Sequence, residues 1–110
     1  MKLLTKMQEQ RLRENHRRQM QSAERDLDFV PVLKLFAGSA TWLLTELDED
    51  NVFFGLCDLG MGFPELGSVS LEELEAYSGF PAIERDLYFC ADKPLSDYAN
   101  EARLHQRIIA

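Results

Sequence analysis

The hydrophobic pattern of the chain changes from helical to strand-like after Pro31. From residue 6 to about residue 23 the chain consists mainly of Gln, Glu, Arg and Met, which are good helix formers, with no Gly or Pro. Thr5 followed by Gln8 predicts an N-cap with a capping box, and Leu4 is placed for a hydrophobic staple. Because apolar positions in this helix are sparse, we expect it to lie on the surface of the domain or against a partner.

Beyond Pro31, short runs of β-forming residues alternate with turns. These runs predict strands at 32–36, 41–47, 52–58, 65–69 and 87–90. The polar turn 48–51 favours an antiparallel hairpin between the second and third strands.

Two further helices are predicted from their start signals. Ser70 with Glu73 opens a short middle helix that runs to about residue 77, and Ser96 caps a C-terminal helix that runs to about residue 107. The inner face of the last helix is expected to carry Tyr98, Ala99, Ala102 and Ile109. Together the elements predict an α+β fold: a small antiparallel sheet of about four or five strands, with its helices on one side.

Composition adds one informative feature, which is an uneven distribution of charge. The chain has 110 residues, which suits a single domain over 1–110, and a net charge of −7. Residues 1–25 hold seven basic and three acidic side chains, whereas residues 26–110 hold five basic and sixteen acidic ones. A basic N-terminal helix is therefore attached to an acidic α+β body.

Cysteine use and hydropathy predict a cytoplasmic location. Cys57 and Cys90 both lie within apolar runs, so we expect reduced, buried thiols rather than a disulfide or a metal site. No apolar stretch approaches the ~18 residues of a transmembrane helix, and the N-terminus lacks the pattern of a signal peptide.

Candidate binding residues lie in the acidic body. They are the carboxylates of the predicted sheet and its turns, together with two apolar side chains of the loop after the third strand: Glu46, Asp48, Glu49, Asp50, Asp58, Met61, Phe63 and Glu65. Such an acidic array could occupy a basic nucleic-acid groove on another protein.

Patterns for catalysis or for a cofactor are weak. Asp58 and Glu65 flank a loop and could act as a carboxylate pair with a divalent metal, but such residues often close loops without chemistry. The turn 48–51 lacks the glycine and terminal glutamate of a calcium loop. His16 and His105 have no orienting partner nearby in the sequence. We therefore expect no resident metal, cofactor or catalytic residue.

The basic helix offers an alternative function. Arg11, Arg13, Arg17 and Arg18 could contact nucleic-acid phosphates along one helix. The acidic body would repel nucleic acid, however, and no aromatic residue is interleaved for base stacking. Docking of this helix on its own domain or on a partner helix is the favoured interpretation.

Several sequence motifs indicate a family. The segments TWLLTELD at 41–48, FGLCDLGMG at 54–62 and PELG at 64–67, with VSLEEL at 69–74, IERD at 83–86 and the start of the last helix at 95–99, resemble a bacterial family of short proteins of unknown function. The resemblance covers nearly the whole chain. Members of that family are typically encoded on plasmids and on integrative or other mobile elements. Phe63 departs from the small or polar residue expected before Pro64, which would make a contact there more hydrophobic.

The leading functional hypothesis combines this resemblance with the acidic body. It is a non-enzymatic accessory protein of a mobile element that binds a host or element-encoded protein, and anti-defence action through an acidic, nucleic-acid-like surface is its sharper form. Direct nucleic-acid binding and a small metal-dependent hydrolase or nuclease are the alternatives. The resemblance implies no cofactor and no catalytic residues.

Overall fold

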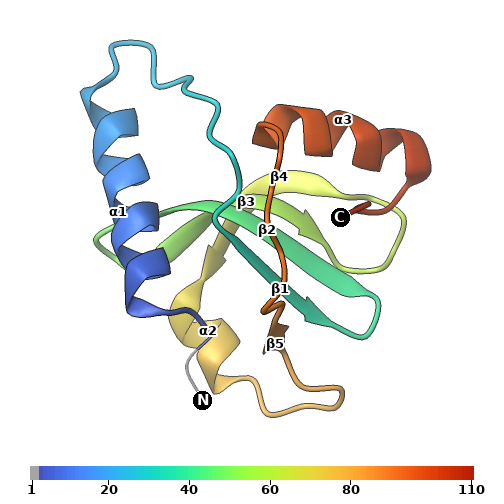
Figure 1. The fold of residues 1–110 in the computed structure, drawn as a ribbon. Helices are drawn as coiled ribbons and strands as arrows, with labels where there is room; N and C mark the ends of the chain where they lie inside the picture. The colour runs from blue at the N-terminus through green and yellow to red at the C-terminus, as the bar shows by residue number, and fades with distance from the viewer. Residues whose placement is uncertain (1–2) are drawn as a thin grey trace.

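The computed structural model describes residues 3–110, which form one antiparallel sheet and three helices. The strands lie in the order β4-β3-β2-β1-β5, all with antiparallel neighbours, so the predicted α+β fold is confirmed (Figure 1). The elements in chain order are α1 (Lys6–Gln21), β1 (Leu33–Ala37), β2 (Ala40–Leu47), β3 (Val52–Asp58), β4 (Glu65–Ser70), α2 (Leu71–Ala76), β5 (Glu84–Arg85) and α3 (Leu95–His105).

The turn between β2 and β3 is held by one carboxylate. Asp48 Oδ1 accepts hydrogen bonds from the N–H groups of Asp50 and Val52, at 2.8 and 3.0 Å. Asn51 has a φ of 59°, a left-handed conformation that Asn tolerates better than most residues. The predicted antiparallel hairpin is therefore present.

One face of the sheet is covered by α1 and α2. The predicted capping box of α1 forms, because Thr5 and Gln8 exchange hydrogen bonds. Leu12 of α1 is fully buried, and the Asn15 side chain donates to the carbonyl of Thr45. The basic helix therefore docks on its own domain. The core on this face comprises Leu3, Leu4, Leu12, Leu33, Leu35, Trp42, Leu44, Leu47, Phe53, Leu71, Leu74 and Ile83.

The expectation that all helices lie on one side is wrong. Figure 1 shows α3 across the sheet from α1, and its Tyr98, Ala99 and Ala102 pack with Leu43 of β2 and Leu56 of β3 in a second core. The physical reason is that β2 and β3 are apolar on both faces, so each face needs a cover.

The prediction of a last strand at 87–90 is also wrong. The fifth strand is the two-residue β5, which pairs with β1, and residues 87–90 leave the sheet. Asp86 causes this exit: its N–H donates to the carbonyl of Lys34, while its Oδ1 accepts from the N–H of Tyr88. Tyr88 is consequently 92% exposed.

The N-terminus of α3 differs from the prediction in its cap. Pro94 occupies the N-cap position, and the hydroxyl of Ser96 instead donates to Asp28, whose other oxygen accepts the Ser96 N–H at 3.1 Å. This contact ties the loop after α1 to α3. At the other end of the helix, Ile108 rather than Ile109 packs against the second core.

The two cysteines have different environments. Cys57 is half-buried, and its burial raises the pKa of the thiol to about 11. Cys90 is exposed, contrary to expectation, because residues 87–90 do not form a buried strand. Both thiols are free. Among residues 3–110, the helices are all too short or too polar to cross a membrane.

Candidate functional site

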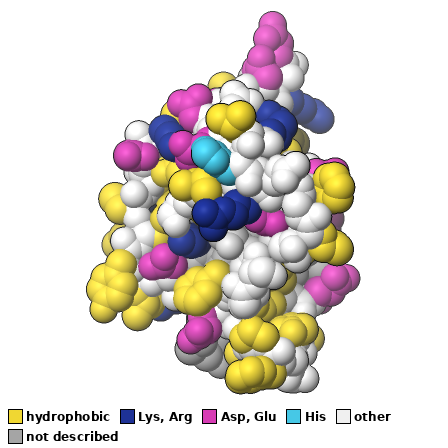
Figure 2. Space-filling view, turned by 90° about the vertical axis from the view of Figure 1, so that its right-hand side faces the viewer, with side chains coloured by type: hydrophobic (Ala, Val, Ile, Leu, Met, Phe, Trp, Pro, Cys, Tyr) yellow, Lys and Arg dark blue, Asp and Glu magenta, His cyan; other side chains and the backbone are white. Residues whose placement is uncertain are grey.

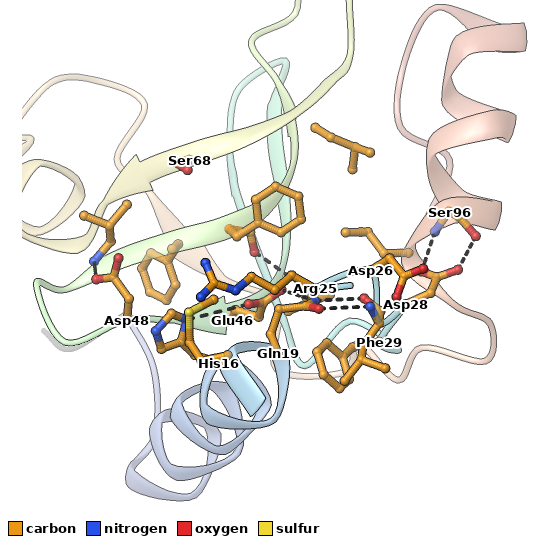
Figure 3. A pocket seen from close by; sticks show the side chains of 18 residues that line it. His16, Gln19, Arg25, Asp26, Asp28, Phe29, Glu46, Asp48, Ser68 and Ser96 are labelled. Carbon is orange, nitrogen blue, oxygen red and sulfur yellow. Dashed lines mark hydrogen bonds and ion pairs between the residues drawn. The ribbon is translucent and has the colours of Figure 1, made fainter. Parts of the chain in front are cut away.

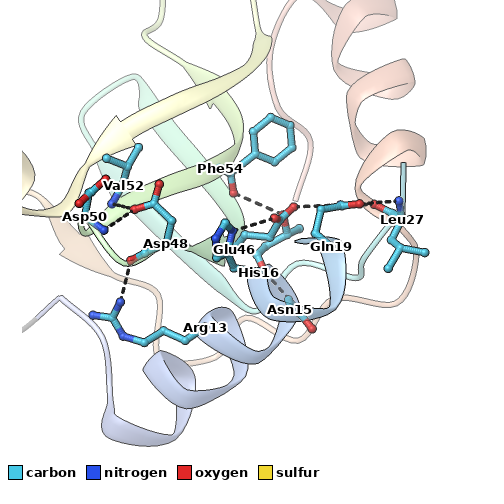
Figure 4. Close-up of polar contacts among 11 residues, drawn as sticks. Arg13, Asn15, His16, Gln19, Leu27, Glu46, Asp48, Asp50, Val52 and Phe54 are labelled. Atoms are coloured by element: carbon cyan, nitrogen blue, oxygen red, sulfur yellow. Dashed lines mark hydrogen bonds and ion pairs between the residues drawn. The ribbon is translucent and has the colours of Figure 1, made fainter. Parts of the chain in front are cut away.

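The predicted acidic residues do not form one array. Glu46 is buried at the edge of α1, where its carboxylate accepts a hydrogen bond from Gln19 Nε2 at 3.3 Å and lies 3.7 Å from His16 Nδ1 (Figure 4). The cause is a β-bulge in β2. Leu44 and Leu47 both join the core under α1, so the alternation skips a step at Thr45 and Glu46 faces the other way.

Asp58 serves an internal structural role. Only 2% of it is exposed, and its two oxygens accept hydrogen bonds from the N–H groups of Gly60 and Ile108, at 2.8 and 3.0 Å. Its carboxylate therefore joins the end of β3 to the segment after α3. Asp58 shares the sheet face of Leu56, whereas Glu65 pairs with Cys57 on the opposite face, so the two carboxylates do not converge. Within residues 3–110, no group of three His, Cys, Asp or Glu side chains is arranged to hold a metal ion.

Other carboxylates gather at one end of β4. Glu49 and Asp50 are exposed at the tip of the β2–β3 turn, and Glu72 and Glu73 are exposed in the first turn of α2. The N–H of Leu71 donates to the carbonyl of Asn51 at 2.9 Å, which brings the two segments together. We call Glu49, Asp50, Glu72 and Glu73 the acidic end. Sequence reasoning missed Glu72 and Glu73 because their helix-start pattern explains them locally.

An arginine of α1 borders the acidic end. Arg13 of α1 donates from its guanidinium to the Asp48 carbonyl and to Asn51 Oδ1, both at 2.7 Å, and to Glu9 at 2.9 Å. Its charge is already shared with Glu9. Within residues 3–110, the four carboxylates of the acidic end form no ion pair with Arg13 or any other cation.

The loop between β3 and β4 exposes three large apolar side chains. Leu59, Met61 and Phe63 are 56%, 69% and 78% exposed; we call them the apolar loop. Gly60 and Gly62 bend the chain there with φ values of 80° and 85°, which only glycine adopts readily. The predicted candidates Met61 and Phe63 are thus both accessible, at the opposite end of β4 from the acidic end.

A groove lies between the end of α1 and the β3–β4 ribbon, as Figure 3 shows. It has a volume of about 540 Å³, and its lining includes Phe54, Leu66, Ser68 and Glu46. The hydroxyl of Thr45 donates to the Phe54 carbonyl, and the hydroxyl of Ser96 to Asp28. These two hydroxyls thus belong to a structural hydrogen-bond network at the groove.

The predicted arginines of α1 divide into two groups. Arg13 points inward, as described above, whereas Arg11, Arg17 and Arg18 border a shallow depression on the outer face of the helix. Arg17 pairs with Glu14 at 2.6 Å, and Arg18 lies over the ring of Phe29 at 5.3 Å.

The overall charge of −7 is not concentrated on the face drawn in Figure 2. Acidic side chains there stand singly among basic ones, and hydrophobic side chains gather towards the edges and the lower end. The acidic end is therefore a local feature rather than part of a continuous negative face on that side.

Comparison with known proteins gives a family for the chain but no activity. No curated protein and no solved structure matches it. The model of the family described as a protein of unknown function, DUF2958, matches residues 3–109, almost the whole chain. This confirms the resemblance to a family of unknown function, and the chain belongs to the DUF2958 family.

Proposed function

We propose that the chain is a non-enzymatic protein-binding module that contacts a host or element-encoded protein through the apolar loop. The observation that supports this most directly is the exposure of Leu59, Met61 and Phe63, at 56%, 69% and 78%, on one short loop. Aromatic and Met side chains are enriched at the centres of protein interfaces, where their burial supplies much of the binding free energy.

The geometry of the loop also favours binding. Asp58 holds the start of the loop through Gly60, and Pro64 is buried at its end. A loop fixed at both ends loses less conformational entropy when a partner immobilises it. The apolar side chains are therefore presented on a prepared support.

The sharper form of the proposal is anti-defence action by charge mimicry. The carboxylates available for this are those of the acidic end, since Glu46 and Asp58 are buried. Glu49, Asp50, Glu72 and Glu73 would face the basic groove of a nucleic-acid-processing or defence complex. The mobile-element setting comes from the family resemblance, and this form of the proposal depends on it.

The test is comparative capture from a lysate of the native host, with nuclease present. Tagged wild-type protein is expected to retain a stoichiometric protein partner, and Phe63→Ala with Met61→Ala to weaken its capture by about tenfold or more. Tyr88→Ala is the matched control, because Tyr88 is also exposed but lies outside the apolar loop. If the loop variant captured as much of the partner as Tyr88→Ala does, the role of the loop would be contradicted.

A second candidate is nucleic-acid binding through α1, which the depression bordered by Arg11, Arg17 and Arg18 favours. Deleting α1 would expose the core at Leu12, so charge substitutions are the cleaner test. If this candidate is correct, Arg11→Glu with Arg18→Glu removes DNA or RNA binding and flattens its salt dependence. Binding that survives both substitutions would exclude it.

A further inference from the structure

The free side of β4 is a row of backbone groups without partners. β4 is an edge strand, and its residues pair with β3 from Cys57↔Glu65 to Val52↔Ser70. The Leu71 N–H bonds to the carbonyl of Asn51, which extends the same register by one pair. Because hydrogen-bonded pairs alternate along an antiparallel ladder, the odd-numbered residues of β4 bond to β3. The N–H and C=O groups of Leu66 and Ser68 therefore point away from the sheet.

These outward groups have no backbone partner among residues 3–110. The strand has little of the usual protection of an exposed edge, since 65–70 contains no Pro, no Lys and no bulge, and its one charged residue is Glu65 at the end of the strand. Leu66 is 43% exposed and its neighbour Phe54 36% exposed, so apolar surface lies beside the open backbone. β4 has the features of a strand that pairs with another chain.

Gly67 lies in the middle of β4 and leaves this part of the edge strand without a side chain. A glycine within a strand is destabilising by about 0.5–1 kcal/mol relative to alanine. At Gly67 no left-handed φ requires glycine, and a Cβ atom would meet nothing within 4 Å. The chain itself thus gives no steric reason for glycine at this position.

Charge identifies the kind of partner. The acidic end lies where β4 runs into α2, and carries four exposed carboxylates. At the other end of β4, Glu65 is an exposed carboxylate that lines a shallow hollow together with Arg103, so that end does not carry the same group of carboxylates. A second copy of this chain would bring another net charge of −7. A basic segment is complementary to the acidic end, and a second copy is not.

We propose that β4 binds an extended segment of a partner protein by antiparallel strand addition, with Lys or Arg residues of that segment lying against the acidic end. This mode rests on the proposed protein-binding function and names its mechanism. In an antiparallel arrangement, the basic residues precede the β-forming residues of the segment, because the acidic end follows β4 in the chain. Side chains of the added strand that lie on the face of Leu66 would form the outer wall of the groove in Figure 3.

The test uses a fluorescent peptide in which lysines precede alternating valine and threonine residues. The control peptide has the same composition with the lysines at its C-terminal end. Fluorescence anisotropy is expected to show tighter binding of the first peptide and weaker binding as salt is added. Equal affinity for the two peptides would contradict antiparallel addition and leave only non-specific charge attraction.

The matched variants are Ser68→Pro and Ser68→Ala. Proline removes the outward N–H and leaves the bonds to β3, whereas alanine removes only the hydroxyl. We expect Ser68→Pro to lower the affinity for the first peptide by about tenfold, and Ser68→Ala to lower it by less than about twofold. Thermal unfolding checks that Ser68→Pro is folded. If it is not, Leu66→Lys replaces it, because a lysine there repels the basic peptide and removes apolar contact.

The outcomes separate this inference from the proposed function. If Ser68→Pro and Leu66→Lys both bind the peptide as the wild type does, strand addition is wrong, although the apolar loop can still bind its partner. If the protein alone dimerises and Ser68→Pro abolishes the dimer, a second copy occupies β4 and the basic partner is wrong. If the peptide tests give the expected results but Phe63→Ala with Met61→Ala leaves partner capture unchanged, the role of the loop is wrong while strand addition stands.

Discussion

The two edges of the sheet differ in how they are protected. β5 has two residues, both charged, and the Asp86 turn removes the chain from the sheet directly afterwards. β4 has six residues and directs the backbone groups of Leu66 and Ser68 outward. Short, charged edges resist pairing with other chains, whereas longer edges with few charges, such as β4 with Glu65 alone, are less protected. The β5 edge is thus protected against pairing and the β4 edge is less so. This difference makes β4 the better candidate for a binding surface.

The largest expected effect concerns the strand that supports β4. A Cβ atom at Gly55 would lie 2.1 Å from the carbonyl oxygen of Leu43 and 2.8 Å from the Cα of Leu44, both backbone atoms that cannot move aside cheaply. Gly55→Ala should therefore destabilise the protein by ~4 kcal/mol or more, measured by urea unfolding. A stable Gly55→Ala variant would contradict the described β2–β3 register.

A smaller loss of stability is expected from Asp58→Ala, because this substitution leaves the N–H groups of Gly60 and Ile108 without their acceptor. The cost should be about 2–3 kcal/mol, because buried donors lose hydrogen bonds to a charged group. Glu65→Ala is the control: Glu65 is exposed, and its removal should change stability by less than about 0.5 kcal/mol. Equal effects in thermal unfolding would contradict the structural role of Asp58.

At the protected edge, Asp86 predicts a small pH dependence. Its hydrogen bond from the Tyr88 N–H, together with Lys34 at 3.4 Å, lowers the pKa of its carboxyl from the ordinary value of 3.8. A lowered folded-state pKa means that the stabilisation is present above that ordinary value and is lost as the pH falls through the folded-state pKa.

Asp86→Asn should therefore reduce stability slightly at neutral pH, and the difference from wild type should shrink as the pH falls below 3.8. Urea unfolding across this range measures it. A difference that grows on acidification would show that the Asp86 contacts do not favour the ionised carboxylate.

The smallest effect is expected at the open edge. Gly67→Ala meets no atom within 4 Å, so it should be neutral or stabilising by about 0.5 kcal/mol in the isolated protein. Because Gly55 and Gly67 are cross-strand partners, the two alanine variants compare a glycine that the fold requires with one that it does not. Marked destabilisation by Gly67→Ala would show that the fold itself needs this glycine.

Local patterns predicted much of the fold. The capping box at Thr5 and Gln8 and the hairpin at 48–51 involve residues close together in the sequence, and both are present. The exposure of Met61 and Phe63 follows from their place in a glycine-containing loop.

Long-range contacts account for what the sequence could not predict. The bulge at Thr45 turns Glu46 inward, and Asp58 is buried by a bond to Ile108, 50 positions away. The side of α3 depends on how both faces of β2 are covered, which no single segment determines. The openness of β4 likewise depends on strand order, because an edge strand and a central strand can have similar sequences.

The most direct test of the open β4 edge is amide hydrogen exchange of the free protein, measured residue by residue by NMR. The structure predicts fast exchange at Leu66 and Ser68, and slow exchange at Gly67 and Val69, whose N–H groups bond to β3. This alternation would establish a backbone row available for pairing. Uniform protection along β4, or uniform exchange, would contradict the account, because the edge would then be already occupied or not formed.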